Sequence, residues 1–397
     1  MHVPLCAAKC AYCDFFSLPR FKWRALAPGR DDVTNAYLKA LHRDIRRQRD
    51  GGIIGPLKTL YIGGGTPSLL GARALAELIA TAGLLPGAEI TVESNPPDVT
   101  PEFLAGLSAA GVNRLSLGVQ SLNKDALAGV CRVYGSQTPE EVSRRALGTI
   151  ASHWKGAFSV DLIAGLPRET PESFAGGLEE VLSYGPRHIS LYELTLEEGT
   201  PLARAVSTGA LPYDDEAAEG LWLSGRDALE ARGFTQYEAS NFALEGCECR
   251  HNGNYWALGN YAAAGAGGTG TLVFANLAQA GMGDTAAIRY TMSPGPDYVD
   301  SGGNAGTVEE LTKGVLLFEA LMLGFRTRTG ILGPAFSTRF GLPLEDAIGA
   351  AGGVFARWQS RGLAVRRETP EGPRYALTRE GLLFHSRFMG QIAARKE

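Results

Sequence analysis

The sequence has few cysteines, little imbalance of charge and no long apolar run. Six cysteines in 397 residues are too few for a disulfide scaffold. A formal net charge of −4 gives no electrostatic basis for binding nucleic acid or an anionic membrane. No apolar stretch approaches the roughly 20 residues that span a bilayer, and the first residues lack the basic and then apolar pattern of a signal peptide. We therefore expect no nucleic-acid partner and at most a peripheral membrane contact.

The composition is instead that of a large protein with a buried core. With 45% hydrophobic and 20% charged residues, a chain of this length is expected to hold two domains. Its 51 glycines are well above ordinary usage and predict many tight turns. Clustered thiols indicate a reducing compartment, so we expect a cytoplasmic protein.

Three of the cysteines stand together near the start of the chain, as Cys6, Cys10 and Cys13 in CAAKCAYC. This spacing lets one short loop direct three thiolates at a single centre. A loop with three ligands holds a [4Fe–4S] cluster with one iron left open, where a small molecule can bind. Tetrahedral zinc is an alternative, but a structural zinc site needs a fourth ligand, for which His2 is the candidate. Unrelated cysteines are the third possibility.

Strand-like apolar runs alternate with helical segments through the first half of the chain. The expected strands are 2–4, 59–63, 89–94, 112–118, 157–165 and 187–194, and the expected helices lie near 34–49, 70–82, 101–110, 123–131, 138–152 and 171–184. Three helices have a Thr-Pro-Glu start, with Thr as the N-cap. Strands that alternate with helices form a parallel sheet covered on both faces. We predict an α/β fold whose first part is a curved, partly open (β/α)6 barrel.

Polar residues gather at the strand ends, where such sheets bind their ligands. In residues 63–68, GGGTPS, the backbone N–H groups can approach a ligand closely. Glu93 ends one strand and Gln120 follows the next, while Asp161 lies inside the strand after that and Arg132 closes the helix that follows Gln120. Each has an ordinary structural explanation, such as capping a helix or complementing its dipole. Their convergence on one end of one sheet, beside the three cysteines, favours a binding site.

The motifs CAAKCAYCDF, YIGGGTPS, ESNPP, LSLGVQS, VDLIAGLP and HISLYEL resemble the radical S-adenosylmethionine (SAM) superfamily, and more narrowly the oxygen-independent coproporphyrinogen III oxidase family. The resemblance runs in family order from His2 to about Ile392. It implies that SAM chelates the open iron of a [4Fe–4S] cluster and is cleaved by one electron to a 5′-deoxyadenosyl radical. It also implies that the GGGTP loop binds the methionine part. The positions that it assigns to cofactor binding are Tyr12, Gly64, Gly65, Thr66, Glu93, Gln120, Arg132 and Asp161.

Two features separate the branches of this family. The oxidase branch typically has a further cysteine where this chain has Phe15. Residues 249–256, CRHNGNYW, contain HNxxYW, which resembles the haem chaperone (HemW-like) branch. That resemblance implies haem binding, with His251 as the axial ligand through its neutral imidazole. A packed, hydrogen-bonded histidine is the structural alternative. We interpret Cys247 and Cys249 as small buried residues rather than ligands.

Some positions depart from the family pattern. The chain begins Met1-His2-Val3-Pro4, so either the start is misassigned or the first strand is short and provides one SAM-binding residue fewer than in relatives. Relatives usually have an acidic residue where Asn260 stands and a histidine near Thr269. We expect the Ala- and Gly-rich residues 260–270 to form a tight loop over the cofactor, without those two polar groups.

A second domain is expected from about Thr307. Residues 308–331 have helical periodicity with a stop at Gly324, and residues 344–368 and 373–392 predict helix, hairpin and helix. The resemblance implies a smaller α+β, winged-helix-like C-terminal domain. Its charges are mixed, so we interpret it as a cover or partner surface rather than a DNA-binding one. The Pro- and Gly-rich residues 293–306 are the expected linker. The predicted domains are 1–235, 236–306 and 307–397.

The hypothesis from sequence is a radical-SAM-type haem chaperone that binds a [4Fe–4S] cluster, SAM and haem and passes haem to an acceptor protein. Its other partner would be a reductant such as flavodoxin or ferredoxin. The alternative is an oxygen-independent coproporphyrinogen III oxidase of porphyrin biosynthesis, and a zinc-stabilised binding module is the third hypothesis. The sequence leaves open whether a substrate is turned over, and it assigns no catalytic residue.

Overall fold

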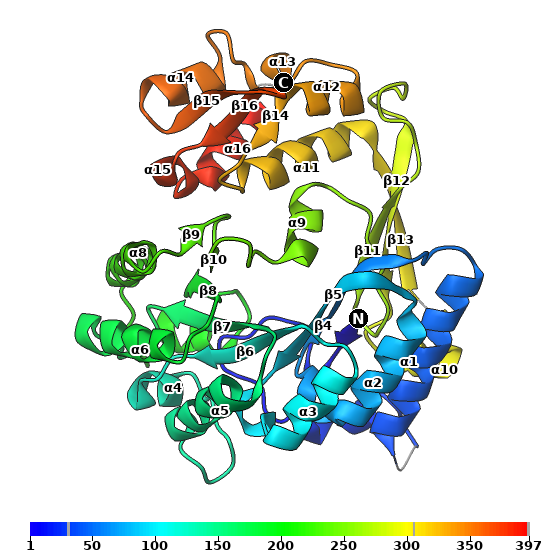
Figure 1. The fold of residues 1–397 in the computed structure, drawn as a ribbon, viewed down its shortest axis with the longest axis vertical. Coiled ribbons are helices and arrows are strands. Elements are labelled where there is room, and N and C mark those ends of the chain that lie inside the picture. Colours follow the sequence, from blue (N-terminus) through cyan, green and yellow to red (C-terminus); the bar gives the residue numbers. More distant parts are fainter. Residues whose placement is uncertain (30–31, 305, 395–397) are drawn as a thin grey trace.

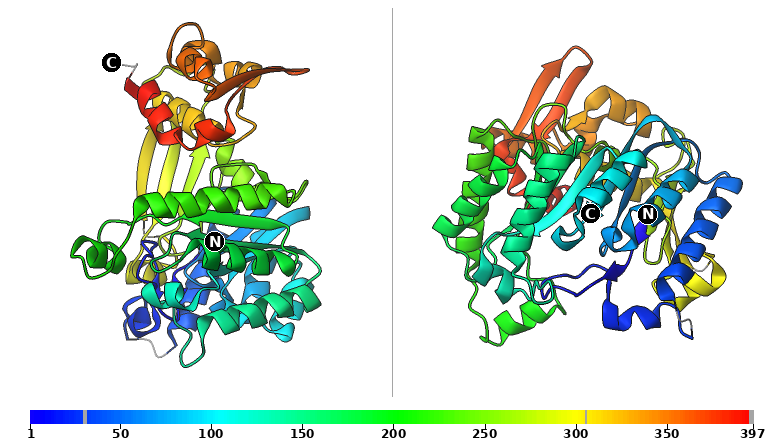
Figure 2. Two further views of the ribbon diagram at one scale, coloured as in Figure 1. Left: turned by 90° about the vertical axis from the view of Figure 1, so that its left-hand side faces the viewer. Right: turned by 60° about the horizontal axis from the view of Figure 1, so that its bottom comes forward.

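Six parallel strands form the main sheet, as the alternation of strands and helices predicts. The computed structural model describes residues 1–29, 32–304 and 306–394. The parallel strands, in their order across the sheet, are β1 (His2–Val3), β4 (Leu57–Gly64), β5 (Leu84–Ser94), β6 (Arg114–Gln120), β7 (Ala157–Ala164) and β8 (His188–Glu193). The sheet is curved, and helices cover its outer face (Figures 1 and 2). This arrangement confirms the predicted partial (β/α)6 barrel.

The helices of the barrel alternate with these strands. They are α1 (Val33–Asp50), α2 (Gly71–Ala82), α3 (Pro101–Ala109), α4 (Lys124–Gly129), α5 (Pro139–His153) and α6 (Pro171–Ser183), with short 3-10 helices η1 (Arg20–Ala25), η2 (Pro67–Leu70) and η3 (Pro96–Asp98). Two of the three Thr-Pro-Glu starts cap as predicted: the hydroxyls of Thr100 and Thr170 accept backbone N–H bonds. The Thr138 hydroxyl instead donates to Glu141. Apolar helix faces meet the strands in one large core.

Two short antiparallel strands extend the sheet beyond the prediction. After β8 come α7 (Pro201–Ser207) and α8 (Asp215–Ala231), and then β9 (Thr235–Gln236) and β10 (Asn241–Ala243). β10 pairs with β8 and β9 pairs with β10, both antiparallel. The HNxxYW residues form the next helix, α9 (Arg250–Trp256). The chain therefore leaves the barrel at the edge formed by β8.

A three-stranded antiparallel sheet lies between the barrel and the C-terminal part (Figure 1). Its strands are β11 (Thr269–Val273), β12 (Thr285–Met292) and β13 (Gly306–Thr312). The expected linker between β12 and β13 is not a free tether, because it contains α10 (Pro296–Ser301). Tyr298 of α10 is fully buried, and its hydroxyl donates to Asp44 of α1 over 2.9 Å. The prolines and glycines of this segment form the turns on either side of α10, and α10 packs against the barrel.

The C-terminal part follows the predicted order, with one correction. Its elements are α11 (Lys313–Phe325), β14 (Ile331–Leu332), α12 (Gly333–Phe340), α13 (Leu344–Ile348), α14 (Val354–Ser360), β15 (Ala364–Thr369), β16 (Gly372–Leu377), α15 (Arg379–Leu382) and α16 (His385–Ala393). The helix expected over 308–331 starts only at Lys313, because residues 306–312 pair with β12 as β13. Thr312 caps the helix by accepting from the Val315 N–H. A second core fills this part, with Phe325, Phe355 and Phe388 fully buried.

The Ala- and Gly-rich residues 260–270 pack against the edge strand β1. The His2 N–H donates to the Ala264 carbonyl over 2.8 Å. Gly265 has φ of 106°, and a Cβ there would lie 2.1 Å from the His2 carbonyl oxygen, so only glycine fits. Asn260 and Thr269, at which the chain departs from the family pattern, have structural roles. The Asn260 side chain hydrogen-bonds the backbone of Val273, and the Thr269 hydroxyl hydrogen-bonds Thr291 across the sheet. Among the described residues, no helix combines the length and apolar character that crossing a bilayer requires.

Candidate functional site

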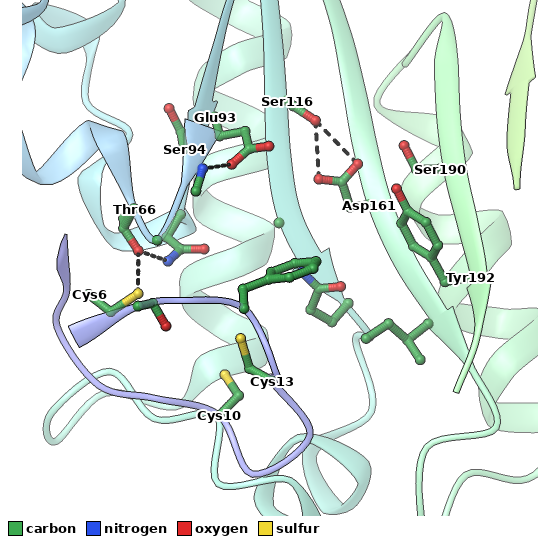
Figure 3. A pocket seen from close by; sticks show the side chains of 18 of the residues that line it. Cys6, Cys10, Cys13, Thr66, Glu93, Ser94, Ser116, Asp161, Ser190 and Tyr192 are labelled. Carbon is green, nitrogen blue, oxygen red and sulfur yellow. Dashed lines mark hydrogen bonds between the residues drawn. The ribbon is translucent and has the colours of Figure 1, made fainter. Parts of the chain in front are cut away.

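The three clustered cysteines lie in a loop at the carboxyl ends of the parallel strands. Cys6 ends β2 (Leu5–Cys6), which pairs in parallel with β3 (Leu18–Pro19) and so closes residues 7–17 as a loop. The Cys13 N–H donates to the Cys10 carbonyl over 3.2 Å, which makes this part a tight turn. Figure 3 shows all three thiols beside one cavity. The loop thus brings the three sulfur atoms to the mouth of the barrel.

The cavity beside this loop has a volume of about 470 Å³. Its wall includes every predicted site residue except His251, namely Cys6, Cys10, Tyr12, Cys13, Gly64, Gly65, Thr66, Glu93, Gln120, Arg132 and Asp161. These residues come from the cysteine loop, from strands β4 to β7 or the turns directly after them and, for Arg132, from the segment after α4. The convergence expected from the order of elements is therefore present in the fold.

The three thiols are not arranged as a site for a single metal ion. Within the described ranges, no three His, Cys, Asp or Glu side chains converge on a point that could hold such an ion. A [4Fe–4S] cluster binds each thiolate to a different iron, so its ligands are spread around a larger centre than the ligands of a tetrahedral zinc. Burial raises the pKa of the Cys6 and Cys13 thiols, so ligation would have to displace their protons.

The GGGTP segment fits closely under the cysteine loop. The Gly65 N–H donates to the Val3 carbonyl over 2.7 Å. A Cβ on Gly65 would lie 2.7 Å from the Leu5 carbonyl oxygen and 3.0 Å from the Cys6 sulfur. The buried Thr66 hydroxyl donates to that sulfur over 3.6 Å. Glycine is required here because the backbone of the turn itself contacts the first cysteine.

Glu93 connects this turn to the floor of the cavity. Its carboxylate accepts a 2.6 Å hydrogen bond from the Tyr61 hydroxyl and a 3.0 Å bond from the Gly64 N–H. Burial raises the pKa of Glu93 to about 7, although both hydrogen bonds oppose this shift. The carboxylate is thus held in place by β4 while it faces a ligand-sized space.

Arg132 is buried at the wall of the same cavity. Its guanidinium donates to the Asn95 side chain over 3.0 Å, to the Gly118 carbonyl, and to the Cys10 sulfur over 3.6 Å. Asn95 in turn donates to the Thr66 hydroxyl over 2.9 Å. A bulge between Gly118 and Gln120, with Gln120 at φ of 70°, directs the end of β6 into the cavity. A series of hydrogen bonds through Thr66, Asn95 and Arg132 therefore connects Cys6 to Cys10.

Asp161 lies deeper in the barrel. Both of its oxygens accept from the Ser116 hydroxyl, at 3.2 and 3.1 Å, and it stands opposite Ser190 in the register of β7 and β8. Figure 3 shows Ser190 and Tyr192 beside it. Burial raises the pKa of Asp161. In the described part of the chain, the buried hydroxyls of Thr91 and Ser94 have no hydrogen-bond partner, so the cavity presents free polar atoms to a ligand.

His251 lies apart from this set, on the wall of a second cavity of about 700 Å³. Its Nδ1 pairs with the Thr59 hydroxyl and its Nε2 with the Tyr255 hydroxyl, both at 2.8 Å. The ring stacks on Tyr61 with centroids 5.3 Å apart, and the backbone N–H donates to Glu89. Burial lowers the pKa of His251 to about 4, so the imidazole is neutral at pH 7. Tyr61 and Gly64 line both cavities.

The two cysteines beside HNxxYW differ in their surroundings. Cys249 is 3% exposed, and its thiol lies 3.6 Å from Glu89 and lines the first cavity. Cys247 is only half-buried, and its carbonyl accepts from Arg114 over 2.9 Å. The interpretation as a small buried residue therefore fits Cys249 but not Cys247.

Sequence reasoning missed several residues of the first cavity. They are Tyr61, Asn95, Arg114, Ser116, His188, Ser190 and Tyr192. A signal for some of them was present, because Ser116, Ser190 and Tyr192 alternate with apolar residues along otherwise buried strands. Such polar positions in a doubly covered sheet must face an interior space.

Comparison with known proteins agrees with this architecture. A family model described as the Radical SAM superfamily matches residues 1–181, and one described as the HemN C-terminal domain matches residues 311–384. Among solved structures, Escherichia coli coproporphyrinogen III oxidase (HemN), a radical SAM enzyme, superposes with a TM-score of 0.78 at 20% identity, over 98% of this chain and 88% of that one. At this identity the likeness shows the fold alone.

Curated relatives narrow the assignment. Heme chaperone HemW of Escherichia coli is 36% identical over 69% of this chain and 70% of its own length. Heme chaperone HemW of Lactococcus lactis is 32% identical over 88% and 86%. A mitochondrial radical S-adenosyl methionine domain-containing protein 1 of Bos taurus is 34% identical over 83% and 73%. The chain belongs to the radical SAM superfamily and, within the HemN-like proteins, to the HemW-like branch.

Proposed function

We propose that this protein is a cytoplasmic haem chaperone that binds a [4Fe–4S] cluster, SAM and haem, and passes haem to an acceptor protein. The observation that carries the proposal is the shared cavity wall, on which the cysteine loop meets the positions that the family uses for SAM. Relatives of this chain along most of its length are named heme chaperones. We also propose that the chain is divided into the domains 1–235, 236–306 and 307–397.

Cys6, Cys10 and Cys13 would hold the cluster, which with SAM supplies one-electron chemistry when bound. The chain's own residues shape this site in three ways. Gly64 and Gly65 bring backbone within reach of a ligand, Glu93 presents a carboxylate to a cationic group, and the buried Arg132 guanidinium stands 3.6 Å from the Cys10 sulfur.

Haem would bind in the second cavity, with His251 as its axial ligand. A neutral imidazole is the form that ligates iron, and burial keeps His251 neutral. Coordination through Nε2 would displace the Tyr255 hydroxyl, while Nδ1 stays bonded to Thr59 and fixes the ring. The wall combines apolar side chains such as Ile53 and Leu57 and the rings of Tyr61 and Tyr261 with polar groups. Such a wall suits a flat apolar macrocycle.

Titration with haem tests this assignment. The His251→Ala variant should lose the axial ligand, with a lower affinity and a changed absorbance spectrum. Tyr255→Phe should bind haem at least as tightly as wild type, because it removes the hydroxyl that competes for Nε2. His153→Ala, at an exposed histidine on α5, is the matched control. Unchanged affinity and spectrum in His251→Ala would refute the assignment.

The cluster has its own test. Anaerobic reconstitution with iron and sulfide should give thiolate-to-iron absorbance that is lost in Cys10→Ser and retained in Cys131→Ser, whose thiol is exposed outside the loop. One zinc per chain without that absorbance would instead support the binding-module hypothesis.

A further inference from the structure

The surface beside the cysteine loop is basic and carries exposed aromatic rings. We define the η1 face as Lys9, Phe15, Arg20, Phe21, Lys22 and Arg24, all of which are exposed. Phe21 is 80% exposed and Phe15 is 66% exposed. Lys22 lies 5.8 Å from the Phe21 ring and Arg20 lies 5.8 Å from the Trp23 ring. Basic groups next to exposed aromatic rings are the composition of a protein interface rather than of an ordinary surface.

The charge of this face opposes that of the whole chain. The formal net charge is −4, yet the first 29 residues contain four basic residues and a single acidic one, Asp14. Glu193 and Glu197 also line the cavity, but they lie outside this segment. The exposed basic groups of the η1 face would therefore attract an acidic partner to this part of the surface.

The η1 face is tied directly to the first cysteine. The Trp23 indole N–H donates to the carbonyls of Leu18, at 2.9 Å, and Cys6, at 3.2 Å. The Cys6 strand β2 also pairs with β3, which leads directly into η1. Figure 2 (right) shows η1 and the cysteine loop side by side, in dark blue, along the lower edge of the molecule. A single side chain, that of Trp23, therefore connects a partner bound on η1 to Cys6, an expected ligand of the cluster.

We propose that the η1 face docks an acidic one-electron carrier protein that reduces the cluster. The proposal rests on the proposed function, because it needs a cluster at Cys6, Cys10 and Cys13. One electron leaves the carrier, which is oxidised by one electron, and enters the cluster, which is reduced by one; no bond forms and no proton moves. Interfaces between redox partners are small and transient. A few basic groups around the exposed rings of Phe15 and Phe21 are therefore enough to form one.

Binding to oxidised flavodoxin, an acidic carrier, tests the surface without any turnover. The reconstituted protein is compared with Lys22→Glu/Arg24→Glu and with the control Arg361→Glu/Arg367→Glu, which changes the net charge equally at exposed sites of the C-terminal part. At low salt, the η1 variant should weaken the affinity by about tenfold or more, and the difference should shrink as salt rises. Phe21→Ala should weaken binding at all salt concentrations, because its contribution is apolar.

Reduction of the cluster gives the second readout. Reduced flavodoxin should reduce the η1 variant about tenfold more slowly than wild type, whereas dithionite should reduce both at the same rate. Equal affinity for flavodoxin in wild type and η1 variant, or an equal loss in the control, would overturn the docking surface alone. A wild type that binds no reducible cluster would overturn the proposed function, and the docking role with it.

Discussion

At the residue scale, the cavity is a set of buried polar side chains that restrain one another. Glu93 is held by Tyr61 and Gly64, and Arg132 is held by Asn95 and Gly118. These hydrogen bonds fix both side chains on the wall of the cavity. In the second cavity both ring nitrogens of His251 have hydroxyl partners, so a ligand of this ring would have to displace one of them.

The titration of His251 predicts how stability depends on pH. Burial lowers its pKa to about 4 in the folded protein, from an ordinary 6.5, so the unfolded chain binds the proton more readily between these values. The free energy of unfolding should therefore fall as pH drops from 6.5 to 4, by about 1 kcal/mol per pH unit from this group. Urea unfolding of His251→Gln should show a shallower decline in that window. Equal slopes in His251→Gln and wild type would contradict the buried, neutral imidazole.

The sequence predicts the cavity residues that have a recognisable pattern, and misses those that depend on register. Cys6 to Cys13 stand out by spacing, and Gly64 to Thr66 stand out as a turn. Asn95 is visible as part of ESNPP, but its bond to Arg132 depends on how β5 and β6 align. Tyr61 reads as an apolar strand residue, and only the fold places its hydroxyl on Glu93. The separation of His251 from the cysteines is likewise a property of the assembled barrel.

At the element scale, the GGGTP turn and the cysteine loop act as one unit. Gly65→Ala should displace Leu5 and Cys6, since a Cβ at Gly65 meets both, and should cost about 1 to 3 kcal/mol of stability. Iron bound per chain after reconstitution should fall with it. Gly176→Ala, inside α6 with open space around it, is the matched control and should bind iron as wild type does. Full iron content in Gly65→Ala would show that the turn does not support the loop.

The elements themselves differ in how far sequence determines them. The long parallel strands and their helices follow from apolar runs and Thr-Pro-Glu starts. β9, β10 and β13 are short or polar, and they form because a neighbouring strand offers unpaired backbone groups. For residues 306–312, pairing with β12 outweighs the helical periodicity that continues into α11.

At the scale of the whole molecule, an ion pair between buried Glu238 and half-buried Arg326 joins the barrel to the C-terminal part. Glu238, which is fully buried, accepts from the Arg326 guanidinium over 2.7 Å, from the Ser240 N–H and from the Asn241 side chain. Arg326 also lies 4.9 Å from the ring of Trp256, the last residue of HNxxYW. This contact couples the C-terminal part to the helix that carries His251.

Breaking that pair should be costly. Arg326→Met leaves the Glu238 carboxylate with two donors and should lower the free energy of unfolding by about 3 kcal/mol. The double variant Glu238→Gln/Arg326→Met should recover most of the loss, because no buried charge is left unpaired. Denaturant unfolding of the three forms measures this difference. A double variant as unstable as the single one would assign the loss to packing against Trp256 instead.

The central claim is that the protein carries haem and gives it up to an acceptor. The most direct measurement mixes the reconstituted, haem-loaded protein with an apo-haem protein under anaerobic conditions, with SAM and a reductant present, and follows the haem spectrum of the acceptor. We expect one haem per chain, transfer to the acceptor, and loss of both in His251→Ala. Failure to bind haem, together with decarboxylation of coproporphyrinogen III under the same conditions, would contradict it and make the protein an oxidase.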